Sequence, residues 1–319
     1  MLPTLPPLDT LRDAIRLNLQ QTLVDERRTP PTTFDEPPGD PGLFGPDSVT
    51  WRLHGDLPSM LVGGLAALML QALHPLAMAG VAEHSAFRED PLGRLQRTAA
   101  FVGVTTFGST EAAEQAMETV RRVHRFVKGT APDGRPYDAT DPDLLTWVHV
   151  AEVSSFLRAY RRYGPRPLSR ADADRYVVEM TVVATGLGAT DVPASVAEIH
   201  DYLAARRPEL VAGSQALTAL AFIVDGGSPT PVVGADPEQL VRGLLVQAAL
   251  DLLPGWARRD YGVRQSFQLE REIVRAGTRS IFAVLRWALG TSEVLEAARA
   301  RSLAPAPEPS RAPRRLVPV

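Results

Sequence analysis

The sequence predicts an all-α fold, and three observations lead to that class. Apolar residues recur at helical spacing along most of the chain, as they do from Asp9 to Val24. Helix-start signals are strong, with an oxygen-bearing cap followed by proline at Asp141-Pro142 and at Asp236-Pro237. Strand signals are few, and the best of them, Pro231 to Val233, is short. We therefore expect one large helical domain with flexible ends.

In the first half of the chain, the expected elements alternate with proline- and glycine-rich connections. The segment from Thr29 to Pro46 is rich in proline and should form an extended arm after the first amphipathic helix. A strongly apolar helix should follow from about Ser59, with a kink at or near Pro75, because proline removes a backbone donor and clashes with the preceding turn. Two further helices are expected at Leu92 to Phe107 and at Glu111 to Val127, with Gly129 as a left-handed stop after Lys128.

In the second half of the chain, Thr130 to Tyr137 is expected to be a loop, and the helix that begins at Asp141-Pro142 should run to Tyr163. Further helices are expected after Ser169, after Ser195 with Glu198 as its capping-box partner, from Asp236-Pro237 to Leu253, from Gln268 to Ala288 and from Ser292 to Leu303. We divide the chain into an N-terminal helix and arm over residues 1–50, a helical domain over residues 51–303 and a disordered tail over residues 304–319.

Composition excludes several classes of protein. The 319 residues include no cysteine, which rules out disulfides, thiolate metal sites, thiol catalysis and covalently attached c-type haem. The 34 basic residues are matched by 37 acidic ones, so we expect no basic face for nucleic acid. The sole lysine, Lys128, follows Val127 where a Walker-type phosphate loop requires glycine, so that chemistry is excluded too.

One stretch has the composition of a membrane span. Met60 to Ala82 contains no Asp, Glu, Lys or Arg and has the ~20 residues that a bilayer requires. However, Gln71, His74 and Pro75 lie near its middle, and no cationic cluster flanks it. We favour a buried core helix over a stable span and leave peripheral membrane contact open. The N-terminus shows no secretory signal, so a cytoplasmic location is expected.

Three histidines lie among apolar residues on predicted helices: His74, His124 and His149. Taken singly, each is most simply a core histidine whose ring nitrogens are satisfied. Together, in a helical chain without cysteine, they favour a cofactor site, because imidazole is a ready iron ligand. Arg121 and Lys128 flank the helical face of His124, where cations suit the propionates of a haem.

A second cluster consists of Arg94, Arg97 and Thr98, in which Arg94 shares a helical face with each of the other two. Two partly buried cations and a hydroxyl can anchor or polarise a bound oxygen species. The simpler interpretation is a solvated helix face. Interleaved apolar residues and the uncharged turns that follow make that interpretation the weaker one.

Three blocks of the sequence match a known family in order and spacing. QALHPLAMAGVAEHSAFREDPLGRLQRT begins at Gln71, VRRVHRFVKG at Val120 and DPDLLTWVHV at Asp141. Over roughly Trp51 to Pro254 the chain resembles the DUF2236 family, the group of the fungal oxygenase MpaB and the rubber-cleaving latex clearing proteins. The resemblance implies an all-helical fold that encloses a non-covalent b-type haem. It also implies cleavage of carbon–carbon double bonds in isoprenoid chains with dioxygen.

The resemblance also assigns residues. It places the proximal iron ligand at His124 and the distal side at Arg94, Arg97 and Thr98. The distal lysine of the latex clearing proteins is Arg97 here, and arginine stays protonated and ligates iron poorly. An open or water-ligated distal site is therefore expected. A catalytic glutamate is described for that group, with Glu83 the nearest candidate, and the role of His149 stays open.

Three functional hypotheses follow. The leading one is a haem b-dependent oxygenase that uses dioxygen on a small hydrophobic substrate, such as a lipid or terpenoid alkene. The alternative is a non-catalytic haem-binding sensor or carrier on the same helical fold, which also needs His124. The third is a membrane-associated helical protein that uses Met60 to Ala82 as an anchor and in which the histidines are structural.

Overall fold

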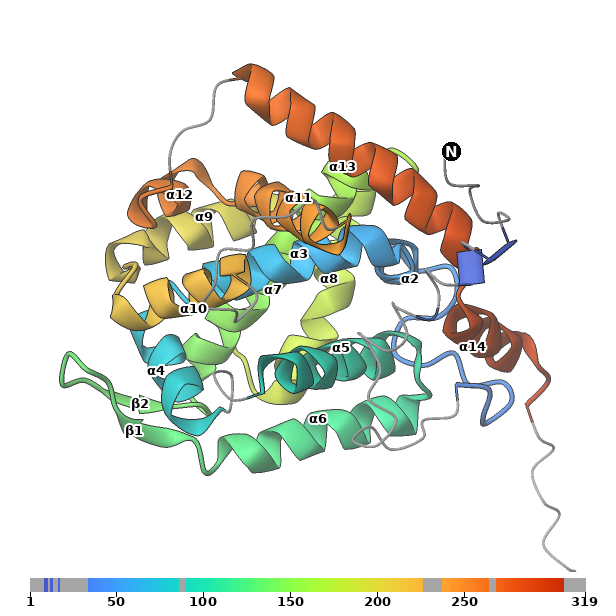
Figure 1. Cartoon of the computed structure of the whole chain (residues 1–319). Helices are drawn as coiled ribbons and strands as arrows, with labels where there is room; N and C mark the ends of the chain where they lie inside the picture. The colour runs from blue at the N-terminus through green and yellow to red at the C-terminus, as the bar shows by residue number, and fades with distance from the viewer. Residues whose placement is uncertain are drawn as a thin grey trace, which may run out of the picture.

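In the computed structural model, the chain is mostly helical and folds as a single domain, as the sequence predicts (Figure 1). The structure describes residues 9–10, 12–13, 17, 34–85, 90–225, 237–263 and 268–306. The helix expected from Asp9 to Val24 and the tail from residue 304 lie mostly outside these residues. The strand expected at Pro231 to Val233 lies wholly outside them.

The predicted helix starts are confirmed where the structure describes them. The side chains of Asp141, Ser169 and Ser195 each accept a hydrogen bond from a backbone N–H in the first turn that follows. The elements of the first half are α2 (Val49–His54), α3 (Leu57–Gln71), α4 (Pro75–His84), α5 (Pro91–Phe107), α6 (Thr110–His124), β1 (Lys128–Thr130), β2 (Pro136–Asp138) and α7 (Pro142–Tyr163). Those of the second half are α8 (Arg170–Leu187), α9 (Val196–Arg206), the 3₁₀ helix η1 (Arg207–Glu209), α10 (Ser214–Asp225), α11 (Pro237–Leu252), α12 (Gly255–Asp260), α13 (Gln268–Leu289) and α14 (Glu293–Leu303).

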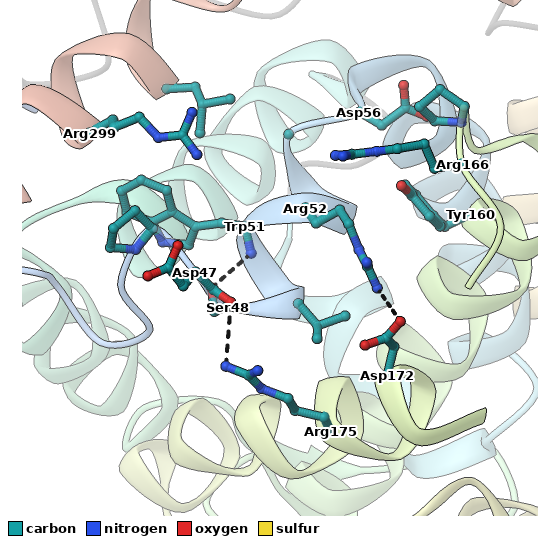
Figure 2. Close-up of a pocket in the computed structure, with 15 residues that line it drawn as sticks. Asp47, Ser48, Trp51, Arg52, Asp56, Tyr160, Arg166, Asp172, Arg175 and Arg299 are labelled. Carbon is teal, nitrogen blue, oxygen red and sulfur yellow. Dashed lines mark hydrogen bonds and ion pairs between the residues drawn. The ribbon is translucent and has the colours of Figure 1, made fainter. Parts of the chain in front are cut away.

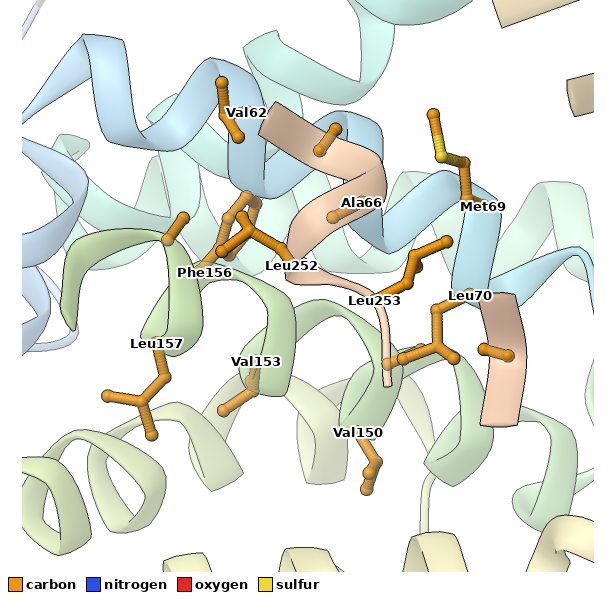
Figure 3. Packing of buried hydrophobic residues seen from close by; sticks show 14 of the residues in the cluster. Val62, Ala66, Met69, Leu70, Val150, Val153, Phe156, Leu157, Leu252 and Leu253 are labelled. Carbon is orange, nitrogen blue, oxygen red and sulfur yellow. The ribbon is translucent and has the colours of Figure 1, made fainter. Parts of the chain in front are cut away.

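The main core forms where α3 packs along α7 (Figure 3). Val62, Ala66 and Leu70 recur every four residues on α3 and are at most 1% exposed. Phe156 of α7 lies against α3, while Val153 projects from another side of α7, so α7 is buried on several sides. This explains why α3 is apolar nearly all round: it is a central helix of the domain.

The close approach of α3 to α7 depends on Gly63. A Cβ atom at this position would lie 2.7 Å from Cδ1 of Phe156 and 3.1 Å from Cβ of Ala159. Gly63→Ala is therefore expected to lower the free energy of unfolding by about 1–3 kcal/mol, measured by urea denaturation. Gly64→Ala is the matched control, because its Cβ would meet Phe156 only at 3.9 Å. It should be neutral or stabilising by up to ~1 kcal/mol, and equal losses in both variants would contradict the packing argument.

The apolar stretch Met60 to Ala82 is divided between two helices. The predicted break is confirmed: α3 ends at Gln71 and α4 begins at Pro75, with an angle of 106° between them. In the part of the chain that the structure describes, no single helix is long and apolar enough to cross a membrane. The bent pair α3 and α4 meets the length and composition test only when its two helices are taken together.

The prediction for the end of α6 was wrong. The helix ends at His124 rather than at Val127, and Lys128 to Thr130 pairs with Pro136 to Asp138 as an antiparallel hairpin. Gly129 is therefore a strand residue rather than a left-handed helix stop. The physical reason is competition for backbone groups, because the carbonyl of Val127 accepts a hydrogen bond from the N–H of Ala139. The segment expected to be a plain loop thus contains the turn and second strand of this hairpin.

Candidate functional site

Five of the predicted site residues lie on one antiparallel helix pair: Arg94, Arg97 and Thr98 on α5, and Arg121 and His124 on α6. α5 and α6 pack together and are joined by only Gly108 and Ser109 (Figure 1). Arg94 lies 14 residues before Gly108, and His124 lies 15 residues after Ser109. Since each helical residue advances 1.5 Å, the two side chains start from the same end of the pair. The proximal and distal candidates of the sequence analysis are thus brought to one level of the fold.

The C-terminal end of α4 lies close to this end of the α5–α6 pair. Nη1 of Arg94 donates to the Ser85 hydroxyl at 2.5 Å, directly after α4 ends. Glu83, in the last turn of α4, accepts a hydrogen bond from the Tyr137 hydroxyl at 2.5 Å. Nε2 of His84 lies 3.2 Å from the carbonyl oxygen of Lys128. Arg94, Glu83 and Lys128 are therefore brought together where α4, α5 and the hairpin meet.

Arg94 is the unpaired cation of this cluster. Burial lowers the pKa of its guanidinium, and the neighbouring Arg97 lowers it further. No carboxylate pairs with Arg94 in the described part of the chain. Arg97, by contrast, is exposed and lies 3.5 Å from Asp90, and the exposed Thr98 donates its hydroxyl to the carbonyl of Arg94. Of the three predicted distal residues, Arg94 is the half-buried cation that has no carboxylate partner among the described residues.

His124 has the properties of a free ligand. It is the last residue of α6, it is half-buried, and burial lowers the pKa of its imidazole. Among the described residues, neither ring nitrogen has a hydrogen-bond partner. A neutral imidazole with an available lone pair is the form that binds iron. Its predicted companions are engaged elsewhere: Arg121 donates to Glu118 and to the carbonyl of Gly186, and Lys128 pairs with Asp138 at 2.9 Å.

His149 and Glu152 lie one turn apart on α7. Burial lowers the pKa of His149 to about 4 and raises that of Glu152 to about 7. Neither side chain has a hydrogen bond or ion pair among the described residues, yet both retain accessible surface. One turn before His149, Leu145 lies near Gly188 at the end of α8, the helix on which α6 packs. This face of α7 therefore points toward the end of α8, and its two ionisable side chains are not fully enclosed.

Glu152 was missed by the sequence analysis. The available signal was a lone carboxylate within the apolar run from Val148 to Phe156 on a helix that is buried on several sides. A carboxyl group that burial keeps protonated near neutral pH can donate as well as accept a proton.

The buried Glu152 makes stability depend on pH. Its pKa is about 7 in the folded protein against an ordinary value of 4.5, so the folded state holds its proton more tightly than the unfolded state. The contribution of Glu152 to stability is therefore fully present below pH 4.5 and is lost as pH rises from 4.5 through 7. We compare the free energy of unfolding of Glu152→Gln with that of wild type. The mutant value minus the wild-type value should be about 3 kcal/mol larger at pH 8 than at pH 4.5.

Urea denaturation at pH 4.5, 6, 7 and 8 measures this difference. Glu114→Gln, at an exposed position of α6, is the control and should change the free energy of unfolding by less than ~0.5 kcal/mol throughout. A Glu152→Gln curve parallel to that of wild type would show that Glu152 ionises normally in the fold.

His74 is not brought to this cluster. It caps the N-terminus of α4, whereas Glu83 lies in the last turn of the same helix. Its ring packs on Trp147 with centroids 5.8 Å apart, and its Nε2 lies 3.8 Å from Glu209. Burial lowers the pKa of His74, and its Nδ1 has no hydrogen-bond partner among the described residues. These contacts suit a structural histidine at the α3–α4 bend.

A pocket of about 400 Å³ lies elsewhere, between α2, α8 and α14 (Figure 2). Two of its arginines are engaged locally: Arg52 pairs with Asp172 at 2.9 Å, and Arg175 donates to the backbone carbonyl of Asp47 at 3.4 Å. None of the predicted site residues lines it.

Comparison with known families gives one finding. Residues 51–290 match the family model described as ER-bound oxygenase mpaB/B'/Rubber oxygenase, catalytic domain. Neither the curated proteins nor the solved structures include a match. The matched range takes in most of α2, all of α3 through α13 and every residue of the cluster described above.

Proposed function

The chain belongs to the mpaB and rubber oxygenase catalytic-domain family, and on that premise we propose that it is a haem b-dependent oxygenase acting on a small hydrophobic alkene. The observation that carries this proposal is the position of His124 and Arg94 at the same end of the α5–α6 pair. Among the described residues, the neutral imidazole of His124 has no hydrogen-bond partner and the guanidinium of Arg94 has no carboxylate partner, and both side chains start from the same end of the α5–α6 pair. The donor set fits a haem, because iron needs a free imidazole and its oxygen ligand benefits from a nearby cation.

His124, Arg94 and Glu152 have distinct roles in this proposal. His124 would hold the iron, and the bound haem would supply the redox chemistry for dioxygen. Arg94 places a fixed positive charge where negative charge develops on oxygen, without reorganisation of water. Glu152, whose pKa of about 7 keeps both protonation states populated at neutral pH, is suited to give or take a proton in an apolar space.

Arg97 occupies the position of the distal lysine of the latex clearing proteins, so this chain should differ from them on the distal side. Its guanidinium is exposed, lies 3.5 Å from Asp90 and stays protonated, so it offers no lone pair to iron. We therefore propose that the distal side is kept open for dioxygen rather than closed by a side-chain ligand.

The absorption spectrum of the purified protein, followed by oxygen uptake, tests the proposal. A Soret band that acid–organic extraction removes completely is expected, since no cysteine is present to attach haem covalently. Oxygen consumption should then depend on an added terpenoid or unsaturated lipid and not on its saturated analogue. A colourless protein would overturn the proposal.

A second function has its own support. Arg97 pairs with Asp90, and Thr98 donates to the backbone carbonyl of Arg94. Two of the three predicted distal groups therefore already have local partners. This favours a haem-binding carrier or sensor as the alternative. Such a protein would show the Soret band but no alkene-dependent oxygen uptake.

A further inference from the structure

A second pocket lies on the opposite side of α7 from His149. Arg158 follows His149 by nine residues, and steps of 100° per residue place the two side chains on opposite faces of the helix. This pocket is therefore separate from the candidate haem site.

The pocket has a volume of about 280 Å³ and is formed by helices far apart in sequence. It combines cationic or ionisable side chains with apolar walls, and no carboxylate lines it. The lining residues are Arg158 from α7, His200, Leu203 and Ala204 from α9, Arg207 from η1 and Trp256 from α12.

Arg158 is a cation without a counter-charge. Its side chain is half-buried, and burial lowers the pKa of its guanidinium with no offsetting contribution from an acid. It has neither an ion pair nor a hydrogen bond in the described residues. Holding a charge away from water is costly unless it is paired. The other arginine, Arg207, lies over the Trp256 ring at 5.8 Å and has no carboxylate partner among the described residues either.

We propose that this pocket binds the carboxylate of a small amphiphilic acid. The carboxylate would pair with Arg158 and Arg207, since guanidinium forms strong charge-assisted hydrogen bonds to carboxylates. Leu203, Ala204 and the indole of Trp256 would cover a short apolar body. The proposal does not depend on haem binding, because none of the pocket residues belongs to the candidate haem cluster.

Titration of the full-length protein with octanoate, followed by calorimetry, tests this assignment. Wild type should bind with a Kd below about 1 mM, and Arg158→Gln should weaken binding by about ten- to a hundred-fold, as expected for loss of a charge-assisted hydrogen bond. Arg207→Gln, at an exposed position, should also weaken binding about tenfold. If Arg158→Gln does not fold, the Arg207→Gln variant still tests whether this pocket binds the carboxylate.

Arg259→Gln is the matched control, because Arg259 is exposed on α12 and does not line the pocket. It removes the same charge nearby and should leave the affinity for octanoate unchanged. Octanol and acetate should each bind at least tenfold more weakly than octanoate, because one lacks the charge and the other lacks the apolar body. The proposal is overturned if wild type does not bind octanoate, if Arg259→Gln weakens binding as much as Arg158→Gln, or if inorganic phosphate binds as tightly.

Discussion

Replacing His124 with alanine is expected to abolish haem binding by the purified protein. The substitution removes the unpartnered imidazole at the end of α6 and leaves the helix caps and the hairpin unchanged. His124 makes no side-chain hydrogen bond in the described part of the chain, so little folding energy should be lost with it. We expect the ratio of Soret to protein absorbance to fall at least tenfold, which corresponds to ~1.4 kcal/mol or more of binding free energy. Thermal unfolding of the apoprotein should stay within about 1 kcal/mol of wild type.

Arg94→Ala and His149→Ala are the comparisons that make this result specific. Arg94 is proposed to act on oxygen, so its loss should leave the Soret band and lower turnover by about 10²–10³-fold. His149→Ala should retain haem, because His149 lies on α7 beside Glu152 and is not the proposed iron ligand. Retention of haem by His124→Ala together with its loss from His149→Ala would reverse the assignment and make His149 the ligand.

The helices were predictable because their signals are local. Asp141, Ser169 and Ser195 cap the helices that the sequence predicts from them, and Pro75 starts a new helix at the predicted break. The end of α6 was not predictable in this way. Val127 continues the apolar pattern of the helix, but its carbonyl is taken by Ala139 in a hairpin whose pairing is not visible in local spacing.

The site was predictable to the extent that its residues lie on one helix pair. Arg94 and His124 were expected, and the short connection at Gly108 brings them to one level. His74 was grouped with them because it is a histidine among apolar residues at helical spacing, but the bend after α3 places it beside Glu209. Glu152 was missed because its significance depends on three-dimensional burial rather than on any motif.

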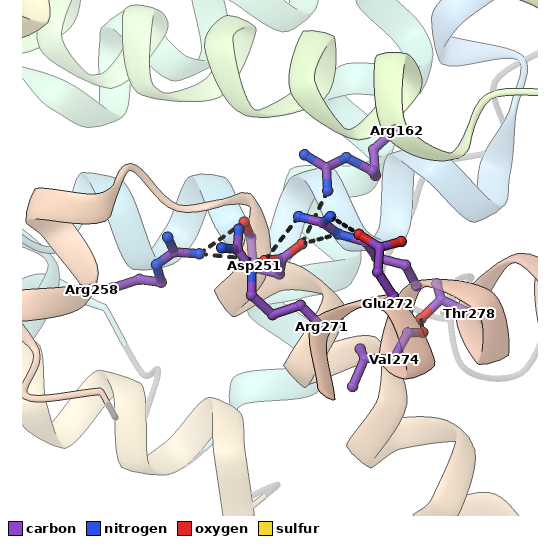
Figure 4. A network of polar contacts seen from close by, with 8 residues as sticks. Arg162, Asp251, Arg258, Arg271, Glu272, Val274 and Thr278 are labelled. Atoms are coloured by element: carbon purple, nitrogen blue, oxygen red, sulfur yellow. Dashed lines mark hydrogen bonds and ion pairs between the residues drawn. The ribbon is translucent and has the colours of Figure 1, made fainter. Parts of the chain in front are cut away.

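The second large effect is expected at Asp251, on the far side of the core (Figure 4). Its carboxylate is 7% exposed and accepts from Nε of Arg271 and from Nε of Arg275, each at 2.8 Å. Nη1 of Arg162 and of Arg258 lie within 3.4 Å of it. One acid thus holds together α7, α11, α12 and α13. Asp251→Ala would leave four neighbouring guanidinium groups without their shared negative charge. We therefore expect a loss of about 3 kcal/mol in the free energy of unfolding at pH 7.

The pH dependence of this loss identifies its electrostatic origin. Although burial alone would raise the pKa of Asp251, the hydrogen bonds from Arg275 and Arg271 lower it below its ordinary value of 3.8. A depressed pKa means that the stabilisation is present at neutral pH and disappears as pH falls through the folded-state value. The difference between wild type and Asp251→Ala should therefore shrink in acid, measured by urea denaturation at pH 7, 4 and 3. Glu272→Ala, which removes a half-exposed partner of Arg275, should cost less than ~1 kcal/mol at pH 7. A difference between wild type and Asp251→Ala that stays constant across this pH range would indicate lost packing rather than lost charge.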